Sequence, residues 1–343
     1  MMMDAFPKRS MNGRSPVLLF NRPQVLRALV FATLLCWPTA AQSSLGLART
    51  GPRADAHPIK ENFITIRQLR IRYVESGRGL PIVMIHGNAG SVEDFNFGAV
   101  DALSANYHVI ALDRPGHGLS DRPRGKRASV EDQARLLHDV LLSLRVSQPV
   151  LVGHSWGAAL ALCYALQYPG EISGLVLAAP AAYPDRGESR FLQALTKLPV
   201  MGDVALIAGR PIVGKHVLRT TLERAFYPQP VPQRYVDLAA ASWLGRKQLR
   251  AYLQDESGLN RTLIKLTKRY RTIAVPTVII TSDHDQIVSA KDNAYRLQAA
   301  MPHAQLITLK DTGHEIPQTH PESIYLAVSL IRNGIGGDDV SER

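Results

Sequence analysis

Short, largely apolar runs constrain the fold of this chain most strongly. Each has four to six residues, and they occupy positions 81–85, 107–112, 149–152, 174–179, 277–281 and 305–309. Such runs are typical of strands that are buried on both faces, as in a parallel sheet. Segments with helical spacing, at 129–144, 156–168, 289–301 and 321–332, follow several of these runs. The alternation predicts an α/β fold with a doubly wound, mostly parallel sheet and helices on both faces.

The alternation stops between residues 183 and 272. Helical stretches in this segment are punctuated by prolines at positions 199, 211, 228, 230 and 232. Proline interrupts a helix, so this segment is expected to contain several separate helices. We therefore predict an α/β core formed by residues 60–182 and 273–335, with a helical cap inserted at 183–272. The core is expected to begin with an antiparallel pair of strands at 63–66 and 69–74.

The N-terminal segment has the features of an export signal. Five basic residues between Lys8 and Arg27 precede an apolar run at 28–37, and small residues follow at 38–41. This order is typical of a secretory signal peptide, although additional apolar length upstream also fits an uncleaved anchor. We therefore predict that residues 1–48 are a signal peptide or an N-terminal membrane anchor. The protein is expected to be exported, to the periplasm or beyond the cell, or to be anchored in a membrane.

The net charge of +11 is concentrated in two segments. Residues 184–272 contain sixteen Lys and Arg against seven Asp and Glu, and residues 1–53 contain seven against one. Basic surface can attract anionic lipid, nucleic acid or acidic substrates, or it can simply be solvated. Because no nucleic-acid-binding motif accompanies the charge, we predict no nucleic-acid partner. A peripheral contact with a membrane stays open.

The sequence Gly153-His154-Ser155-Trp156-Gly157 lies between a predicted strand and a predicted helix. In that context the G-x-S-x-G pattern indicates a nucleophile elbow, a tight turn that exposes the serine hydroxyl. The two glycines leave room for the close approach of strand and helix. The start of the helix places N–H groups and a partial positive charge beside a developing oxyanion. Ser155 is therefore the predicted nucleophile.

A serine hydroxyl needs a base that takes its proton, and the base is usually oriented by a carboxylate. Gly313-His314 directly follows the last predicted strand, so His314 is the predicted base. Two candidate acids, Asp283 and Asp285, follow the strand at 277–281, at the ligand-binding edge of such a sheet. Asp185, after the preceding strand, is a third candidate.

The turn His86-Gly87-Asn88 follows the first buried strand. Backbone at this position can direct an N–H group to the carbonyl oxygen of a substrate, and the residue after the nucleophile supplies a second N–H. We therefore predict that the backbone N–H groups of Asn88 and Trp156 form the oxyanion hole.

Together these motifs resemble the α/β-hydrolase superfamily. The matching pieces cover roughly residues 60–333, and they are His86-Gly87-Asn88, residues 113–120, Gly153-His154-Ser155-Trp156-Gly157, Asp285 and Gly313-His314. The resemblance implies an eight-stranded core with a helical cap. It also favours Asp285 as the acid, because Asp285 precedes Ile287-Val288 as the family acid precedes its apolar pair. The pair Asn88 and Trp156 is similar to the haloalkane-dehalogenase and epoxide-hydrolase branch, whose nucleophile is an aspartate. Ser155 at that position favours acyl chemistry instead.

The sequence thus predicts a serine hydrolase that cleaves a carboxylic ester or related acyl bond of a small molecule. The same three residues also support a carbon–carbon bond hydrolase or a cofactor-free perhydrolase or haloperoxidase. A non-catalytic ligand-binding protein is a further hypothesis, which an intact triad disfavours. We predict no metal and no organic cofactor, since no His/Cys cluster has ligand spacing and no glycine-rich turn matches a nucleotide fingerprint.

Overall fold

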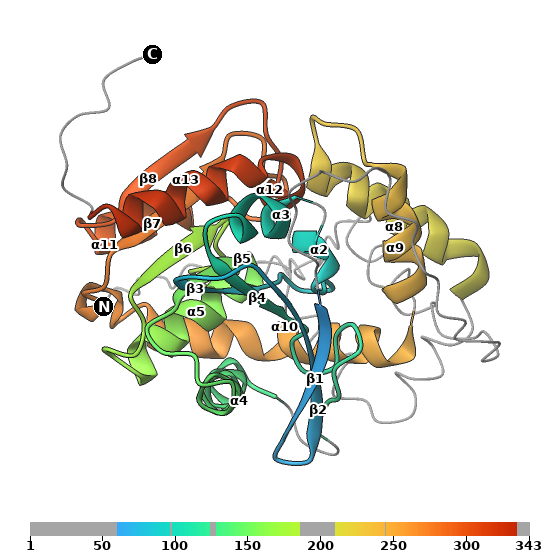
Figure 1. Ribbon diagram of the computed structural model, residues 1–343. Coiled ribbons are helices and arrows are strands. Elements are labelled where there is room, and N and C mark those ends of the chain that lie inside the picture. The colour runs from blue at the N-terminus through green and yellow to red at the C-terminus, as the bar shows by residue number, and fades with distance from the viewer. Residues whose placement is uncertain (1–59, 97, 124–127, 186–209, 244, 335–343) are drawn as a thin grey trace, which may run out of the picture.

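The computed structural model describes residues 60–96, 98–123, 128–185, 210–243 and 245–334. The predicted signal peptide or anchor at 1–48 lies outside them. Within the described ranges, no helix has both the length and the apolar character that a membrane crossing requires. Strands and helices alternate along the chain around a central sheet (Figure 1).

Eight strands form one sheet. In chain order they are β1 (Lys60–Ile66), β2 (Leu69–Ser76), β3 (Pro81–Ile85), β4 (His108–Leu112), β5 (Val150–His154), β6 (Gly174–Ala178), β7 (Thr277–Ser282) and β8 (Gln305–Leu309). Across the sheet their order is β1-β2-β4-β3-β5-β6-β7-β8. β2 pairs antiparallel with β1 and with β4, and the other pairings are parallel. The predicted mostly parallel, eight-stranded α/β fold is confirmed.

Helices cover both faces of the sheet (Figure 1). One layer contains α4 (Val130–Ser143), α5 (Trp156–Gln167) and α11 (Ala294–Ala300). The other contains α3 (Ala99–Ser104), α13 (Pro321–Arg332) and the short helices α2 (Glu93–Asn96) and α12 (Ile316–Thr319). Strand residues alternate between the two layers: in β3, Val83 and Ile85 pack toward α4 and α5, whereas Ile82 and Met84 pack toward α3 and α13. Burial on both faces explains why these strands are apolar throughout.

One helix is shorter than the sequence predicts. A helix was expected over 289–301, but α11 begins at Ala294. The side-chain oxygen of Asn293 accepts hydrogen bonds from the N–H groups of Ala182 (3.0 Å) and Tyr183 (2.9 Å). These contacts hold Asn293 at φ −120° and ψ −76°, outside the helical region, so the preceding residues form turns instead.

In the described part of the segment between β6 and β7, the chain forms three helices and a short 3₁₀ turn. They are α8 (Arg210–Phe226), α9 (Gln233–Ser242), α10 (Arg246–Leu266) and η1 (Tyr270–Thr272). In Figure 1, α8 and α9 lie to one side of the sheet, near α2, while α10 runs below it past α5. α8 and α9 share a small apolar cluster around Leu222, Phe226 and Tyr235. Leu259 and Leu263 of α10 instead join the main core beside α4 and α5, so α10 docks the insertion on the core.

The helical conformation of α10 can be tested at Gly258. No atom lies within 4 Å of the position that a Cβ at Gly258 would occupy. Because glycine in a helix interior costs about 0.5–1 kcal/mol relative to alanine, Gly258→Ala should raise the free energy of unfolding by about that amount. Chemical denaturation measures it. Gly157→Ala in α5 is the opposite control, since its Cβ would lie 2.2 Å from the carbonyl oxygen of Ile85 and should destabilise the protein. A clear loss of stability in Gly258→Ala would contradict a folded α10.

Candidate active site

The predicted site residues lie in loops at one edge of the sheet. Strands β3 to β8 all run parallel to one another, so their C-terminal ends lie at the same edge. The loops after β3, β5, β7 and β8 carry Asn88, Ser155, Asp285 and His314 respectively. Parallel pairing therefore gathers segments that are far apart in the chain at the edge where ligands bind in such sheets.

Ser155 occupies a strained turn between β5 and α5. Its backbone has φ 53° and ψ −116°, a conformation that non-glycine residues adopt only when the surroundings enforce it. The N–H of Ser155 donates to the carbonyl of Ala178 at 2.9 Å, and its carbonyl accepts from the N–H groups of Ala158 and Ala181. These three hydrogen bonds hold the turn, and the Ser155 side chain stays partly exposed at its tip.

The two glycines of the elbow are required by close backbone contacts. A Cβ at Gly153 would lie 2.6 Å from the carbonyl oxygen of Gly157. A Cβ at Gly157 would lie 2.2 Å from the carbonyl oxygen of Ile85, at the end of β3. Both distances are too short for any side chain, so the G-x-S-x-G spacing follows from how tightly α5 approaches the strands.

Asp285, rather than Asp283, contacts His314. The Nδ1 atom of His314 lies 2.8 Å from Oδ2 of Asp285, and both side chains are buried. The other carboxylate oxygen of Asp285 accepts the N–H groups of Ile287 and Val288, each at 2.8 Å. These apolar neighbours thus orient Asp285 through their backbone.

Asp283 serves a different purpose. Its carboxylate accepts the N–H groups of Asp311 (3.1 Å) and Thr312 (3.2 Å), and it contacts His284. Asp283 therefore ties the loop after β7 to the loop after β8. Asp185, the third candidate, pairs through its backbone with Asn260 of α10. Of the three aspartates, Asp285 is thus the one that the structure brings to His314.

The charges of Asp285 and His314 stabilise each other. Burial alone would lower the pKa of His314, but the charge and hydrogen bond of Asp285 outweigh it and raise the pKa above its usual value. Burial would raise the pKa of Asp285, yet His314 and the two N–H donors hold it below its usual range. Asp285 therefore remains ionised while His314 titrates, as a carboxylate that orients a base must.

His154, inside the elbow, connects it to the loop of His314. The Nε2 atom of His154 lies 3.0 Å from the carbonyl oxygen of His314, and the two rings lie 4.9 Å apart. Burial, together with the nearby His314, lowers the pKa of His154 to about 3. The neutral ring therefore donates an Nε2–H to this carbonyl and holds the loop of His314 close to Ser155.

The turn at Gly87 and Asn88 packs directly against Ser155. A Cβ at Gly87 would lie 3.2 Å from Cβ of Ser155, so the turn and the elbow are in contact. The side-chain amide of Asn88 donates to Glu256 (2.6 Å) and to the carbonyl of Tyr252 (3.3 Å), both in α10. Among the described residues, no hydrogen bond uses the backbone N–H of Asn88. Trp156 is the first residue of α5, where an N–H has no partner within the helix.

The structure also brings together two buried carboxyl groups, one of which follows His314 directly in the chain and the other of which lies near the first. They are Glu315 and Asp94, and the hydroxyl of Tyr235 in α9 donates to Asp94 at 3.2 Å. Burial raises the pKa of Glu315 to about 7, and burial together with the charge of Glu315 raises the pKa of Asp94 well above its usual range. The residues come from three distant segments, so no local pattern in the sequence marks them.

One group of side chains in the described part of the chain has the spacing of cation ligands. Atoms of Asp283, His284 and Asp311 lie within 4.8 Å of one another. Asp283 already accepts two backbone N–H groups and contacts His284, and the side chains lie at the surface. This arrangement is explained by the loop contacts, and we assign no metal to it.

The sheet, the flanking helices and the strand–turn–helix geometry at Ser155 define an α/β hydrolase. Residues 81–321 match the family model described as the alpha/beta hydrolase fold, and the chain belongs to this family.

Individual relatives include proteins of known and unknown activity. An uncharacterized protein of Mycobacterium tuberculosis, Rv2715, is 32% identical over 280 residues, which cover 77% of this chain and 78% of that protein. The human monoacylglycerol lipase ABHD6 is 26% identical over 272 residues, which cover 74% and 79% respectively. The crystal structure of Cfl2 from Burkholderia cenocepacia is similar with a TM-score of 0.67 at 24% identity, covering 83% of this chain and 98% of that chain. At this identity the structural likeness speaks for the fold alone.

The role of the acid can be tested with a matched pair of substitutions. Asp285→Asn should lower kcat by about 10³- to 10⁴-fold, because the amide no longer orients His314 or stabilises its protonated form. Asp283→Asn changes a neighbouring carboxylate in the same way, but this residue contacts loop backbone instead, so its loss should be far smaller. Steady-state kinetics on a chromogenic ester compares them. The reverse ranking would assign the acid to Asp283.

The pH dependence follows from the raised pKa of His314. Only the neutral imidazole accepts a proton, so kcat/KM should fall as the pH drops through this pKa. Because Asp285 raises it, the midpoint should lie above the unperturbed value of about 6.5. In Asp285→Asn the residual activity should show a lower midpoint. A wild-type midpoint clearly below about 6.5 would contradict the assignment.

Proposed function

We propose that this protein is a serine hydrolase that cleaves carboxylic esters of small molecules through an acyl-enzyme. The observation that carries the proposal is the strained elbow at Ser155 together with the buried pair of His314 and Asp285. Strain at a residue is retained only where the surroundings over-determine it, and such residues cluster at functional sites. The lipase among the relatives supports the same reaction class.

The proposed reaction begins with attack of the Ser155 hydroxyl oxygen on the ester carbonyl carbon. Asp285 contacts Nδ1 of His314, so the opposite nitrogen, Nε2, takes the hydroxyl proton. The electron pair of the carbonyl moves to its oxygen, and the N–H groups of Asn88 and Trp156 stabilise the resulting oxyanion. His314 then returns the proton to the leaving alcohol. A water molecule cleaves the acyl-enzyme by the same steps and releases the carboxylic acid.

The limits of the proposed substrate class come from the residues beside the turn at Asn88. Glu256 contacts Asn88 directly, and Asp255 precedes it in α10. The cation that contacts this turn, Arg114, is already paired with Asp255, so it is not free to bind a substrate that carries its own negative charge close to the ester bond. We therefore propose a neutral ester as substrate. The peripheral membrane contact stays a prediction, because the N-terminal segment lies outside the described residues.

Substitution of the nucleophile tests the proposal. Ser155→Ala should abolish ester hydrolysis, with a loss of about 10⁴-fold or more in kcat, and should also abolish labelling by a fluorophosphonate probe. Ser143→Ala also removes a serine hydroxyl, but from an exposed position at the end of α4. It should leave ester hydrolysis and probe labelling unchanged. Circular dichroism establishes that each variant is folded.

Two results would contradict this function. One is a Ser155→Ala variant that retains more than about a tenth of the wild-type rate. The other is a folded wild-type protein that neither reacts with the probe nor hydrolyses a panel of neutral esters. Product analysis on the same panel, with diketones and with peroxide plus a carboxylic acid, identifies which bond is broken.

A further inference from the structure

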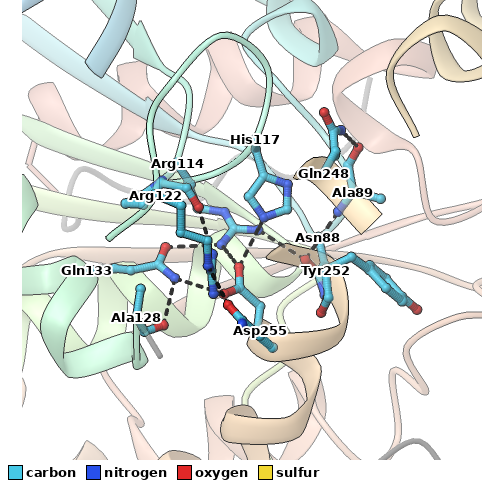
Figure 2. A network of polar contacts seen from close by, with 12 residues as sticks. Asn88, Ala89, Arg114, His117, Arg122, Ala128, Gln133, Gln248, Tyr252 and Asp255 are labelled. Atoms are coloured by element: carbon cyan, nitrogen blue, oxygen red, sulfur yellow. Dashed lines mark hydrogen bonds and ion pairs between the residues drawn. The ribbon is translucent and has the colours of Figure 1, made fainter. Parts of the chain in front are cut away.

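Arg114, in the loop after β4, is wholly buried and faces the turn at Gly87 and Asn88. Its guanidinium donates to the carbonyl of His86 at 3.2 Å, to the carbonyl of Gly87 at 3.0 Å and to the side-chain oxygen of Asn88 at 3.3 Å. Figure 2 shows the side chain at the centre of a network that joins this turn to α10. The planar guanidinium therefore holds two consecutive peptide units, those between His86 and Gly87 and between Gly87 and Asn88.

These contacts determine where the N–H of Asn88 points. In a trans peptide the carbonyl of Gly87 and the N–H of Asn88 lie in one plane and point in opposite directions. Arg114 holds this carbonyl on its own side, so the N–H of Asn88 must point away from Arg114. Nδ1 of His86 lies 2.7 Å from the same carbonyl oxygen and reinforces its position. A rotated peptide would remove the predicted donor from the oxyanion hole.

The same guanidinium also covers Trp156, the source of the second donor. The Cζ atom of Arg114 lies 3.9 Å from the centroid of the Trp156 ring, and both side chains are buried. A cation stacked on an indole face is attracted to it, and the contact is stronger without water. Arg114 therefore touches both residues whose N–H groups form the proposed oxyanion hole.

A buried guanidinium needs a buried negative partner, and that partner comes from the insertion. Nη1 of Arg114 donates to Oδ2 of Asp255 in α10 at 2.6 Å, and neither side chain is exposed (0%). Asp255 also accepts from Arg122 (2.8 Å), Gln133 (3.1 Å) and His117 (3.1 Å). Its carboxylate is therefore fully engaged (Figure 2), and α10 supplies the charge that keeps Arg114 in place.

We propose that Arg114 is a positioning residue that sets the oxyanion hole, and that Asp255 makes this hole depend on the docking of α10. The proposal rests on the ester hydrolysis proposed above. Arg114 itself is set back behind the turn and acts through the peptide of Gly87 and Asn88 and through the ring of Trp156.

The test uses two variants that leave neither Arg114 nor Asp255 charged without the other. Arg114→Lys keeps a positive partner for Asp255, but an ammonium group cannot hold both carbonyls and stack on Trp156. The double variant Arg114→Met/Asp255→Asn removes both charges and keeps an acceptor for Arg122. Both should lower kcat on a neutral p-nitrophenyl ester by about 10²- to 10³-fold, the effect of losing an oxyanion donor, while KM changes little.

Two further measurements separate positioning from general damage. The affinity for an alkylboronic acid, which forms a tetrahedral adduct with the serine, should weaken by a factor similar to the loss in kcat. The pH midpoint that reports His314 should not move, since the contact of Asp285 with His314 is untouched. The matched control is Arg122→Gln, which loses a 2.8 Å contact with Asp255 and whose original side chain has its other partners at Pro115 and Gln254. It should keep its kcat even if its thermal stability falls.

The outcomes decide the proposal. If either folded Arg114 variant keeps kcat and boronic acid affinity within about threefold of wild type, the positioning role is overturned while ester hydrolysis stands. If Arg122→Gln loses as much kcat as the Arg114 variants, the effect belongs to the whole network and the proposal is likewise overturned. A wild-type protein that is inert toward esters and fluorophosphonate would overturn the proposed function as well.

Discussion

The buried ion pair between Arg114 and Asp255 is the contact on which the arrangement around Ser155 depends. A charge without access to water is stable only when it is paired and its remaining hydrogen-bonding positions are filled. The pair joins the loop after β4 to α10, and the guanidinium continues to the turn after β3 and to the first residue of α5. Three core elements and one inserted helix thus share one charged group, and the geometry of the turn at Gly87 follows from it.

Contacts from the insertion also hold the loop that carries His314. The N–H of His314 donates to the carbonyl of Ala225 in α8 at 2.7 Å, and a Cβ at Gly313 would lie 2.4 Å from the carbonyl oxygen of Tyr227. The hydroxyl of Tyr235 in α9 donates to Asp94, whose carboxyl group lies near Glu315. Each of the three helices described in the insertion therefore hydrogen-bonds to a segment of the core that carries or supports a candidate site residue. The described helices of the insertion form part of the wall that holds the site.

Whether the sequence predicts a contact of this site depends on how far apart in the chain the two residues lie. The elbow is local, because Gly153 and Gly157 are dictated by α5 approaching β3 and β5, so five consecutive residues carry the signal. The ends of the strands can also be predicted from short stretches of sequence, and they place Asp285 and His314 at one edge of the sheet. The contacts of Asp255 and Asn293 are not local: an aspartate within a helical pattern looks like a solvated residue, and Asn293 leaves the helix only because the backbone of Ala182 lies beside it. Such partners are known only once the chain is folded.

The energetics of the ion pair also restrict how a substrate reaches Ser155. Lifting α10 away from the core would separate Arg114 from Asp255 and would also break the hydrogen bonds that Asp255 accepts from Arg122 and Gln133, so each of these contacts opposes the movement. The same movement would remove the partner that keeps Arg114 on the peptide of Gly87, and with it the support of the proposed oxyanion hole. An entry route through α10 would thus be both rare and unproductive. Access that leaves α10 docked keeps the proposed oxyanion hole assembled while the ester binds, so a substrate would reach Ser155 with the proposed N–H donors already in place.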